Sequence, residues 1–271
     1  MIADALKKSL LQAAIQGKLT EQLPEDGDAR DLLREIQKEK AWLVKEGKIK
    51  KEKPLPEIQE DEIPFDIPEN WVWVRISIIG EIIGGGTPRT DDKRNWVNGD
   101  IPWITPADMK NQKERYISQG GRFITKYGLL HSSAQLLQKG TVLFSSRAPI
   151  GYVAIAKNEL STNQGFKSIT PYHFAMSDFI YYFLLSSRDE IERIGSGTTF
   201  KEVSGSTMKN ILIPIPPLAE QERIVRKLDE LLPKIEALKV EENKLEELEK
   251  AFPGKIRASL LQAAIQGKLT E

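Results

Sequence analysis

A stretch of thirteen residues occurs twice in this chain without change. Residues 9–21, SLLQAAIQGKLTE, recur as residues 259–271, at an offset of 250 positions. Weaker similarity extends upstream, where Leu6-Lys7 matches Ile256-Arg257. Two independent amphipathic helices are very unlikely to share thirteen consecutive residues, so the 271 residues are expected to hold one repeating unit and the first residues of the next. This pattern suggests a longer tandem array, a chain start that meets the end of another copy, or a cloning duplication.

The first copy of the repeat lies in a predicted helix. Apolar side chains recur at helical spacing through residues 2–16, and the glycine that follows is placed to end the helix. Asp28 can cap a second helix. The chain is therefore expected to begin with a helical segment over residues 1–47. Residues 48–70 are dense in charge and hold four prolines, which predicts an extended linker with little core.

From Trp71 the pattern changes to short runs rich in β-branched and aromatic residues, separated by glycine, asparagine and proline. One helix interrupts them, with Ser177 as its cap and Gly195 at its end. The predicted strands are 71–79, 101–105, 121–125, 141–145, 151–156, 166–170 and 211–215. Residues 71–216 are thus predicted to form a strand-rich mixed α/β domain, and the whole chain belongs to the α+β class.

A long helical pattern follows Pro216-Pro217. Its apolar positions are spaced mostly by three and four residues, as in a coiled-coil seam, and they are Ile224, Leu228, Leu231, Ile235, Leu238, Leu245, Leu248 and Phe252. Residues 218–252 would form a rod of about 50 Å, which Pro233 can kink and Pro253-Gly254 is expected to end. A single apolar stripe needs a partner, either the N-terminal helices or another chain. Residues 217–271 are interpreted as a spacer and dimerisation segment of a homodimer.

Composition narrows the classes of protein. The chain has no cysteine, no apolar run of about 18 residues and no secretory signal, which fits a cytoplasmic protein without a membrane segment. The formal net charge is zero but unevenly distributed. Residues 71–216 carry 17 basic and 12 acidic side chains, whereas residues 1–70 carry 12 and 16. The positive excess therefore lies in the predicted strand-rich domain, and it is modest.

No catalytic signature is recognisable. Gly84-Gly85-Gly86 follows a strand but has neither the spacing of a dinucleotide fingerprint nor the ending of a P-loop. Residues 195–199 can hold a phosphate through backbone amides, but a flexible helix exit explains their composition equally well. His131 and His173 are the only histidines and lie in different segments, so a shared metal site or triad is a remote alternative. We therefore expect no catalytic residues and no metal ligands.

Polar and basic residues gather instead on the predicted turns between strands. Arginine is suited to reading guanine and asparagine or glutamine to reading adenine, while serine, threonine and lysine hold phosphates. Roughly a third to a half of these candidates are expected to contact DNA if the interpretation is right. The candidates are Thr87, Arg89, Lys93, Arg94, Ser146, Arg147, Thr162, Asn163, Gln164, Lys167, Thr199 and Lys201.

Three motifs resemble those of a known family. They are GTVLFSSRAPIG at 140–151, STNQGF at 161–166 and IPIPPLAEQERIV at 213–225, of which the last is the most specific. The resemblance is to the specificity subunits of type I restriction-modification systems, and it covers essentially the whole chain. It implies two target-recognition domains in full-length members, separated by conserved helical regions that pack antiparallel. This chain has one such domain and one long helix, so it resembles a half-subunit.

The resemblance implies a DNA-recognition subunit without catalytic activity of its own. In the family, a modification subunit transfers a methyl group from S-adenosylmethionine to adenine and a restriction subunit cuts, so S-adenosylmethionine and ATP would belong to those partners. A homodimer would present one reader twice to double-stranded DNA, at a palindromic bipartite site. The helices around 1–46 and 218–271 are the expected docking surface for modification subunits. The alternative is an antirestriction-like or remnant protein that binds the modification subunit without reading DNA.

Overall fold

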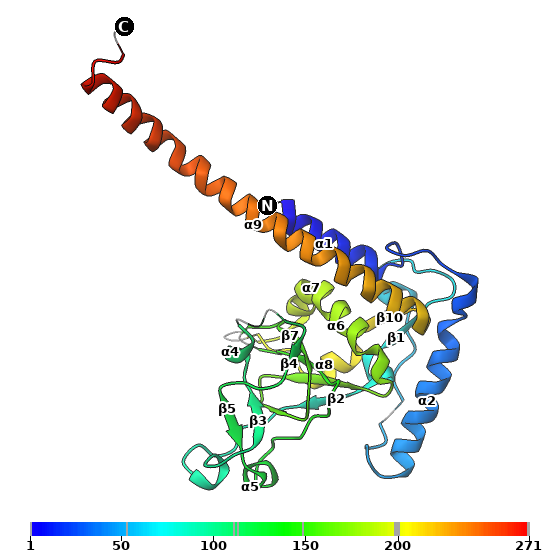
Figure 1. The fold of residues 1–271 in the computed structure, drawn as a ribbon. Helices are drawn as coiled ribbons and strands as arrows, with labels where there is room; N and C mark the ends of the chain where they lie inside the picture. The colour runs from blue at the N-terminus through cyan, green and yellow to red at the C-terminus, as the bar shows by residue number, and fades with distance from the viewer. Residues whose placement is uncertain are drawn as a thin grey trace.

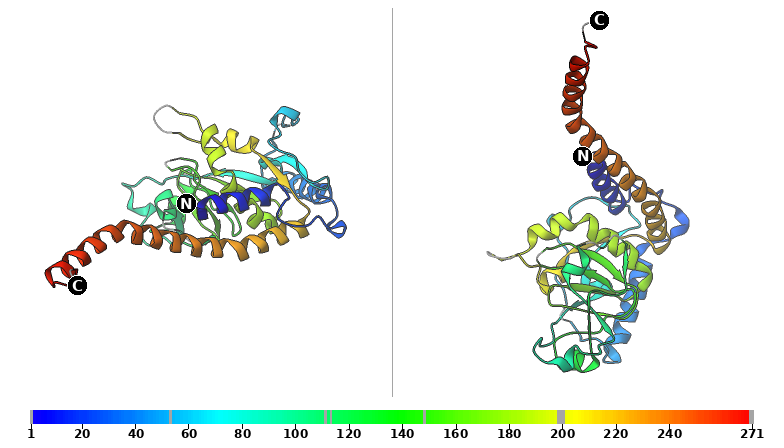
Figure 2. Two further views of the ribbon diagram at one scale, coloured as in Figure 1. Left: turned by 90° about the horizontal axis from the view of Figure 1, so that it is seen from above. Right: turned by 60° about the vertical axis from the view of Figure 1, so that its left-hand side comes forward.

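The computed structural model describes residues 2–52, 54–110, 112, 114–147, 149–197 and 201–269. A body of short strands and helices carries two long helices on one side, and the longer helix projects far beyond the body (Figure 1). Two further views show that the projecting helix is curved and ends well away from the rest of the molecule (Figure 2). Within the described residues, no helix is both long and apolar enough to cross a membrane.

Both predicted N-terminal helices are present. α1 spans Ile2–Ile15 and α2 spans Ala29–Lys45. The Asp28 carboxylate caps α2 by accepting a hydrogen bond of 2.7 Å from the backbone N–H of Arg30. Gly17 follows α1 with a φ angle of 69°, a left-handed conformation that glycine adopts without steric cost.

The described part of the linker before Trp71 is mostly extended and holds the short 3-10 helix η2 (Glu60–Glu62). The Phe65 ring lies edge-on to Trp73, with 4.9 Å between the ring centroids. Phe65 and Ile67 also pack against the main core. The linker therefore contributes more apolar contact than its charge and its prolines predict.

Ten strands form three sheets in the described part of the chain. The smallest pairs β1 (Val72–Arg75) with β10 (Leu212–Ile215), antiparallel. The largest has the order β2 (Gly80–Gly84), β9 (Lys167–Pro171), β6 (Val142–Phe144), β7 (Val153–Ala156) and β4 (Tyr116–Ile117). The third has the order β5 (Arg122–Ile124), β3 (Ile101–Ile104) and β8 (Ser161–Thr162). β3 and β8 are parallel, so both end at the same edge of their sheet.

The predicted strand at 71–79 is wrong in its second half. β1 ends at Arg75, and the single-turn helix α3 (Ile76–Ile79) leads into β2. Ile76 and Ile79, three positions apart, are both fully buried, and an apolar run this short fits a strand or a buried helical turn.

The predicted helix after Ser177 is also divided, because α6 (Ser177–Ser186) and α7 (Arg188–Ile194) are separate helices. The remaining short helices are η1 (Pro24–Asp26), η3 (Lys93–Asn95), α4 (Pro106–Met109), α5 (Lys126–Leu130), η4 (Phe174–Met176) and α8 (Gly205–Asn210).

The main core lies between the largest sheet and the long helices. α6 occupies this layer, because it contacts β6 and β7 on one side and α1 and α9 (Leu218–Ile265) on the other. Its Phe179, Ile180 and Phe183 are buried together with Phe144 of β6. A helix covered on opposite sides is apolar over most of its surface, which matches the sequence of α6.

α9 is one continuous helix of 48 residues, so the predicted end at Pro253-Gly254 is wrong. Pro253 lacks the N–H that would bond to the carbonyl of residue 249, but this part of the helix is exposed and water can bond to that carbonyl. Pro233 also lies inside the helix. The rod is therefore about 70 Å long at 1.5 Å per residue, rather than about 50 Å.

α1 lies antiparallel on the first half of α9. Lys7 forms an ion pair with Glu236 at 2.7 Å, and Asp4 pairs with Lys239 at 2.5 Å. The Glu242 carboxylate accepts hydrogen bonds of 2.9 and 3.1 Å from the backbone N–H groups of Ile2 and Ala3. α1 therefore begins beside Glu242. Beyond that residue α9 continues, and α1 no longer lies alongside it (Figure 1).

The predicted dimer seam divides at this point. Ile224, Leu228 and Ile235 are buried by the chain's own elements, so these three residues are not available to another chain. Leu231 and Leu238 line an apolar groove together with Leu6 and Leu10 of α1. The last three, Leu245, Leu248 and Phe252, are 57 to 61% exposed. The N-terminal helix is thus the partner of the first part of the stripe, and only the later part remains uncovered.

Candidate nucleic-acid interface

A tight turn follows β8 and carries three of the predicted DNA-contacting residues. The backbone N–H of Asn163 donates to the carbonyl of Ile104 at 3.0 Å, which continues the pairing of β8 with β3. The Asn163 side-chain oxygen then accepts from the N–H of Gly165 at 2.9 Å and closes the turn. This leaves Gln164 exposed at the tip and Thr162 buried. Thr162 is therefore a structural residue of the turn and not a surface contact.

The glycine run lies directly on this turn. The N–H of Gly86 donates to the carbonyl of Thr162 at 2.9 Å, and a Cβ added at Gly85 would lie 1.9 Å from the carbonyl oxygen of Asn163. The Thr87 hydroxyl donates to the side-chain oxygen of Gln164. The glycines thus permit a close backbone approach that brings two predicted residues, 77 positions apart, to one exposed surface.

A second group of predicted residues adjoins the other side of the turn. Ser146 is fully buried, and both its N–H and its hydroxyl donate to the carbonyl of Gly165, at 2.7 and 3.2 Å. Ser146 therefore positions the turn and cannot reach DNA directly. The Lys167 ammonium lies 3.1 Å from the Glu202 carboxylate and 3.5 Å from the Ser146 hydroxyl.

Arg147 and Lys201 are next to this ion pair. Arg147 forms a β-bridge with Glu202 through the backbone, and its side chain has no acidic partner among the described residues. Lys201 is exposed. Thr199, another predicted contact, lies outside the described residues. The segment from Ser161 to Lys167 thus contacts both the glycine run and the segment around Ser146.

The remaining basic candidates lie on a separate loop and are largely paired with acids. Arg89 pairs with Asp91 at 2.9 Å and Arg94 with Asp92 at 2.7 Å, while Lys93 is exposed. Hydrogen bonds from the guanidinium groups lower the pKa of both carboxyl groups, and both arginine pKa values are raised in turn. All four side chains lie at the surface, where such pairs contribute little and can exchange for phosphate.

One basic residue of this loop region was not predicted. The Arg122 guanidinium on β5 lies 3.6 Å from the ring centroid of Trp96 and 5.3 Å from that of Trp103. Trp103 in turn donates from its indole N–H to the carbonyl of Gly86 at 2.9 Å, which links this stack to the glycine run. No local sequence pattern indicates the stack, because the three residues are brought together only by the fold.

The family model for the type I restriction modification DNA specificity domain matches residues 68–250. The chain belongs to this family. The match begins just before β1 and extends well along α9, so it includes the surface described above.

Two curated specificity subunits illustrate the similarity. The MjaIX specificity subunit of Methanocaldococcus jannaschii is 47% identical over 160 residues, which cover 58% of this chain and 37% of that protein. The EcoAI specificity subunit of Escherichia coli is 30% identical over 258 residues, which cover 87% of this chain and 41% of that protein. The chain thus spans about two fifths of the length of these relatives.

Solved structures of the family have a similar fold. The HsdS subunit from Thermoanaerobacter tengcongensis superposes with a TM-score of 0.52 at 25% identity, covering 89% of this chain and 54% of that one. A chain from a study of complex assembly and conformational transition of the type I R-M system gives a TM-score of 0.56 at 25% identity, covering 89% and 55%. The mixed α+β body with its long C-terminal helix is therefore the fold of the specificity subunits.

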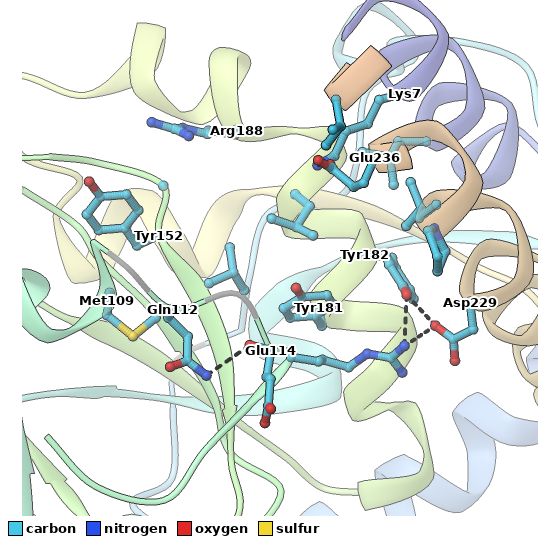
Figure 3. A pocket seen from close by; sticks show the side chains of 18 residues that line it. Lys7, Met109, Gln112, Glu114, Tyr152, Tyr181, Tyr182, Arg188, Asp229 and Glu236 are labelled. Atoms are coloured by element: carbon cyan, nitrogen blue, oxygen red, sulfur yellow. Dashed lines mark hydrogen bonds and ion pairs between the residues drawn. The ribbon is translucent and has the colours of Figure 1, made fainter. Parts of the chain in front are cut away.

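A cavity of about 730 Å³ lies between the strand-rich body and the helices α1 and α9 (Figure 3). Arg115 lies at one side, where it pairs with Asp178 at 2.7 Å and with Asp229 of α9. Tyr182 of α6 donates its hydroxyl to Asp229 and accepts from Arg115. Burial is the main cause that raises the pKa of Tyr182, and its bond to Asp229 adds to it. These groups satisfy one another, so this cluster joins α9 to the specificity domain.

Asp108 fixes the chain between β3 and β5 of the specificity domain. Its carboxylate accepts from the N–H and hydroxyl of Thr105, at 2.8 and 2.6 Å, and from the N–H of Gly121 at 2.8 Å. Partial burial alone would raise the pKa of Asp108, but these hydrogen bonds outweigh burial and lower it.

Replacing Asp108 with asparagine is expected to lower the free energy of unfolding by about 1 kcal/mol at neutral pH. Because the folded-state pKa is lowered, the carboxylate stabilises the fold above its unfolded-state pKa, and this contribution is lost as pH falls through the folded-state pKa. Urea unfolding at several pH values measures the effect. Asp100→Asn, at an exposed position just before β3, is the control and should change the free energy of unfolding at neutral pH much less.

Proposed function

We propose that this chain is the DNA sequence-recognition subunit of a type I restriction-modification system. Its family membership supports the class of function. We assign DNA recognition to the surface where three segments meet. They are the glycine run, the turn of residues 161–167 and the segment around Arg147. These three segments are distant in sequence and meet at one exposed edge of the domain.

The exposed groups at this edge have the chemistry of base and phosphate recognition. Gln164 presents a carboxamide, which can read adenine, and Arg147 presents a guanidinium, which can read guanine. Lys201 is suited to phosphates, as are two residues outside this edge, Lys93 of the separate loop and Arg122 of β5. Arg89 and Arg94 would first leave their acidic partners, so we assign them to the backbone rather than to the bases.

We further propose that the chain acts as a homodimer on a palindromic bipartite site. The uncovered stripe of α9, with Leu245, Leu248 and Phe252, supports an interface between two copies. The chain itself would be non-catalytic. It would guide a modification subunit and a restriction subunit, to which S-adenosylmethionine and ATP would belong. The helices of residues 1–46 and 218–271 would be the docking surface for modification subunits.

A second candidate is an interaction protein that binds the modification subunit without reading DNA. Two observations favour it, namely the zero formal net charge and the pairing of Arg89 and Arg94 with acids. Co-expression with the cognate modification subunit separates the two candidates. Mapping adenine methylation by sequencing should give a palindromic split motif that disappears when the gene for this chain is removed, and an unchanged methylation pattern would support the second candidate.

Arg147→Ala tests the proposed surface once the motif is known. If Arg147 reads a base, the variant should lose about 1 to 3 kcal/mol of discrimination at one position of the site. If it holds a phosphate, affinity should fall to a similar extent for all sequences. Fluorescence anisotropy with the cognate duplex and single-position variants measures both. Arg226→Ala, an exposed arginine on α9, is the control, and equal behaviour of the two variants would contradict the assignment.

A further inference from the structure

The repeated sequence lies in two opposite environments. In α1, Leu11 and Ile15 are 6% and 4% exposed. The equivalent residues of the second copy, Leu261 and Ile265 on α9, are 59% and 87% exposed. Both copies are helical and their sequences are identical, so the difference lies only in what covers them.

The surface that covers the first copy is defined by the structure. α1 packs on α6 and on the first half of α9, where its Leu6 and Leu10 lie beside Leu231, Ile235 and Leu238. We call the surface of α6 and α9 that α1 covers the α1 groove. A sequence that is identical to the core of α1 has the same complementarity to this groove.

We propose that the second copy of the repeat docks in the α1 groove of a second copy of this chain, in exchange with the α1 of that chain. The inference rests on the homodimer proposed above and specifies how the two chains meet. Each chain would donate the part of α9 beyond Glu242 to the other, in a reciprocal arrangement with two-fold symmetry.

The register follows from the α1 contacts and the offset of the repeat. Lys7 pairs with Glu236 within one chain. Arg257 lies 250 positions after Lys7, so it would face Glu236 of the other chain and keep the ion pair. Ile256 and Leu260 would take the places of Leu6 and Leu10. The two α9 helices are then antiparallel, with the symmetry axis between residues 246 and 247.

This register also pairs residues that played no part in deriving it. It brings Leu245 of each chain opposite Leu248 of the other chain. These leucines are 57% and 59% exposed in the single chain. The register was derived from the α1 contacts and the repeat, and it also covers the exposed leucines of the stripe. This second match supports the arrangement independently.

The exchange trades polar contacts for apolar ones. When the second repeat replaces α1, the bonds of the α1 N-terminus to Glu242 and the ion pair of Asp4 with Lys239 are lost. The second repeat cannot restore them, because Pro253 and Gly254 stand at the positions equivalent to Ala3 and Asp4. The ion pair of Asp4 with Lys239 lies at the surface, where it contributes little, and the bond of Ala3 to Glu242 is partly buried. The apolar area of the repeat is the same in either state, and the facing leucines add burial that only the dimer has.

Cross-linking tests the exchange, since the chain has no cysteine of its own. Lys234 lines the groove, so Lys234→Cys is combined with Leu260→Cys in one variant and with Leu10→Cys in the matched control. A short bismaleimide should join the first pair between chains and give a covalent dimer. The second pair should be joined within a chain, and its yield should fall as protein concentration rises and the dimer forms.

A third experiment separates this inference from the homodimer itself. Leu245→Cys chains mixed with Leu248→Cys chains should cross-link to each other in any antiparallel dimer with this axis, and the two cysteines are kept on separate chains because residues three positions apart on one helix would react with each other. If this mixture gives a covalent dimer while Leu260→Cys does not react with Lys234→Cys, the exchange is overturned and the homodimer stands. If sedimentation shows a monomer at all concentrations, both are overturned.

A charge placed in the second repeat gives a quantitative readout. Leu261→Asp should weaken dimerisation by at least about tenfold, because it places a carboxylate at the position of the buried Leu11. Gln262→Asp adds the same charge at the neighbouring position and should change the dimerisation constant much less. Equal effects of the two variants would overturn the docking of this face.

Discussion

Replacing Glu220 with alanine is expected to lower the free energy of unfolding by about 3 kcal/mol. The Glu220 side chain is fully buried at the start of α9 and accepts three hydrogen bonds. They come from the Trp71 indole N–H at 2.8 Å, the Gln22 amide at 2.7 Å and the Thr20 hydroxyl at 3.1 Å. Alanine would leave the buried indole N–H without its acceptor and release the segment after α1 from α9.

Urea unfolding of the variant measures this loss. Glu222→Ala is the matched control, because it removes an exposed carboxylate from the same turn of α9 and should change the stability by less than about 0.5 kcal/mol. Equal stabilities of the two variants would show that the buried contacts of Glu220 do not hold the helices to the domain.

Gly85→Ala should destabilise the chain by about 1 to 3 kcal/mol and weaken DNA binding at the same time. A Cβ at this position would meet the Asn163 carbonyl oxygen at 1.9 Å and the Thr162 hydroxyl at 2.4 Å. The glycine run would have to move off the turn, and the hydrogen bond between Thr87 and Gln164 would be lost with it.

The neighbouring glycine supplies the control for this effect. Nothing lies within 4 Å of a Cβ placed at Gly84, so Gly84→Ala should be tolerated. Thermal unfolding and DNA anisotropy on both variants test the prediction. A Gly85→Ala variant that matches Gly84→Ala in both assays would mean that the close approach of loop and turn is not needed.

Local patterns predicted the elements whose boundaries are set by neighbouring residues. Gly17 marks the end of α1 and Asp28 marks the start of α2, as predicted. Both signals depend only on residues close by in the sequence. The two-residue strands β4 and β8 could not be predicted, since only their partners β7 and β3 make them strands. α9 passes through Pro253 because exposure to water lowers the cost of the missing hydrogen bond.

The candidate site was predicted better by region than by residue. Residue type and turn position indicated Gln164 and Arg147, which are accessible, but equally Ser146 and Thr162, which are buried. Polar character alone does not distinguish a residue that builds a turn from one that projects from it. Arg122 was missed because its stack on Trp96 depends on strand pairing. Within the motif at 213–225, the buried role of Glu220 could be seen only with Trp71 and Gln22 in place.

The pairing of β1 with β10 has a consequence for how such a protein can change. The chain enters and leaves its strand-rich body through two neighbouring strands, with Val72 opposite Ile215 and Arg75 opposite Leu212. This ladder and the contacts of α6 with α1 and α9 join the body to the helices, and the bond between Trp71 and Glu220 lies next to the ladder. Mutations at exposed turn positions of the body, such as Gln164, can therefore accumulate without shifting α1 or α9. New preferences for a ligand can evolve independently of the geometry by which the helices assemble.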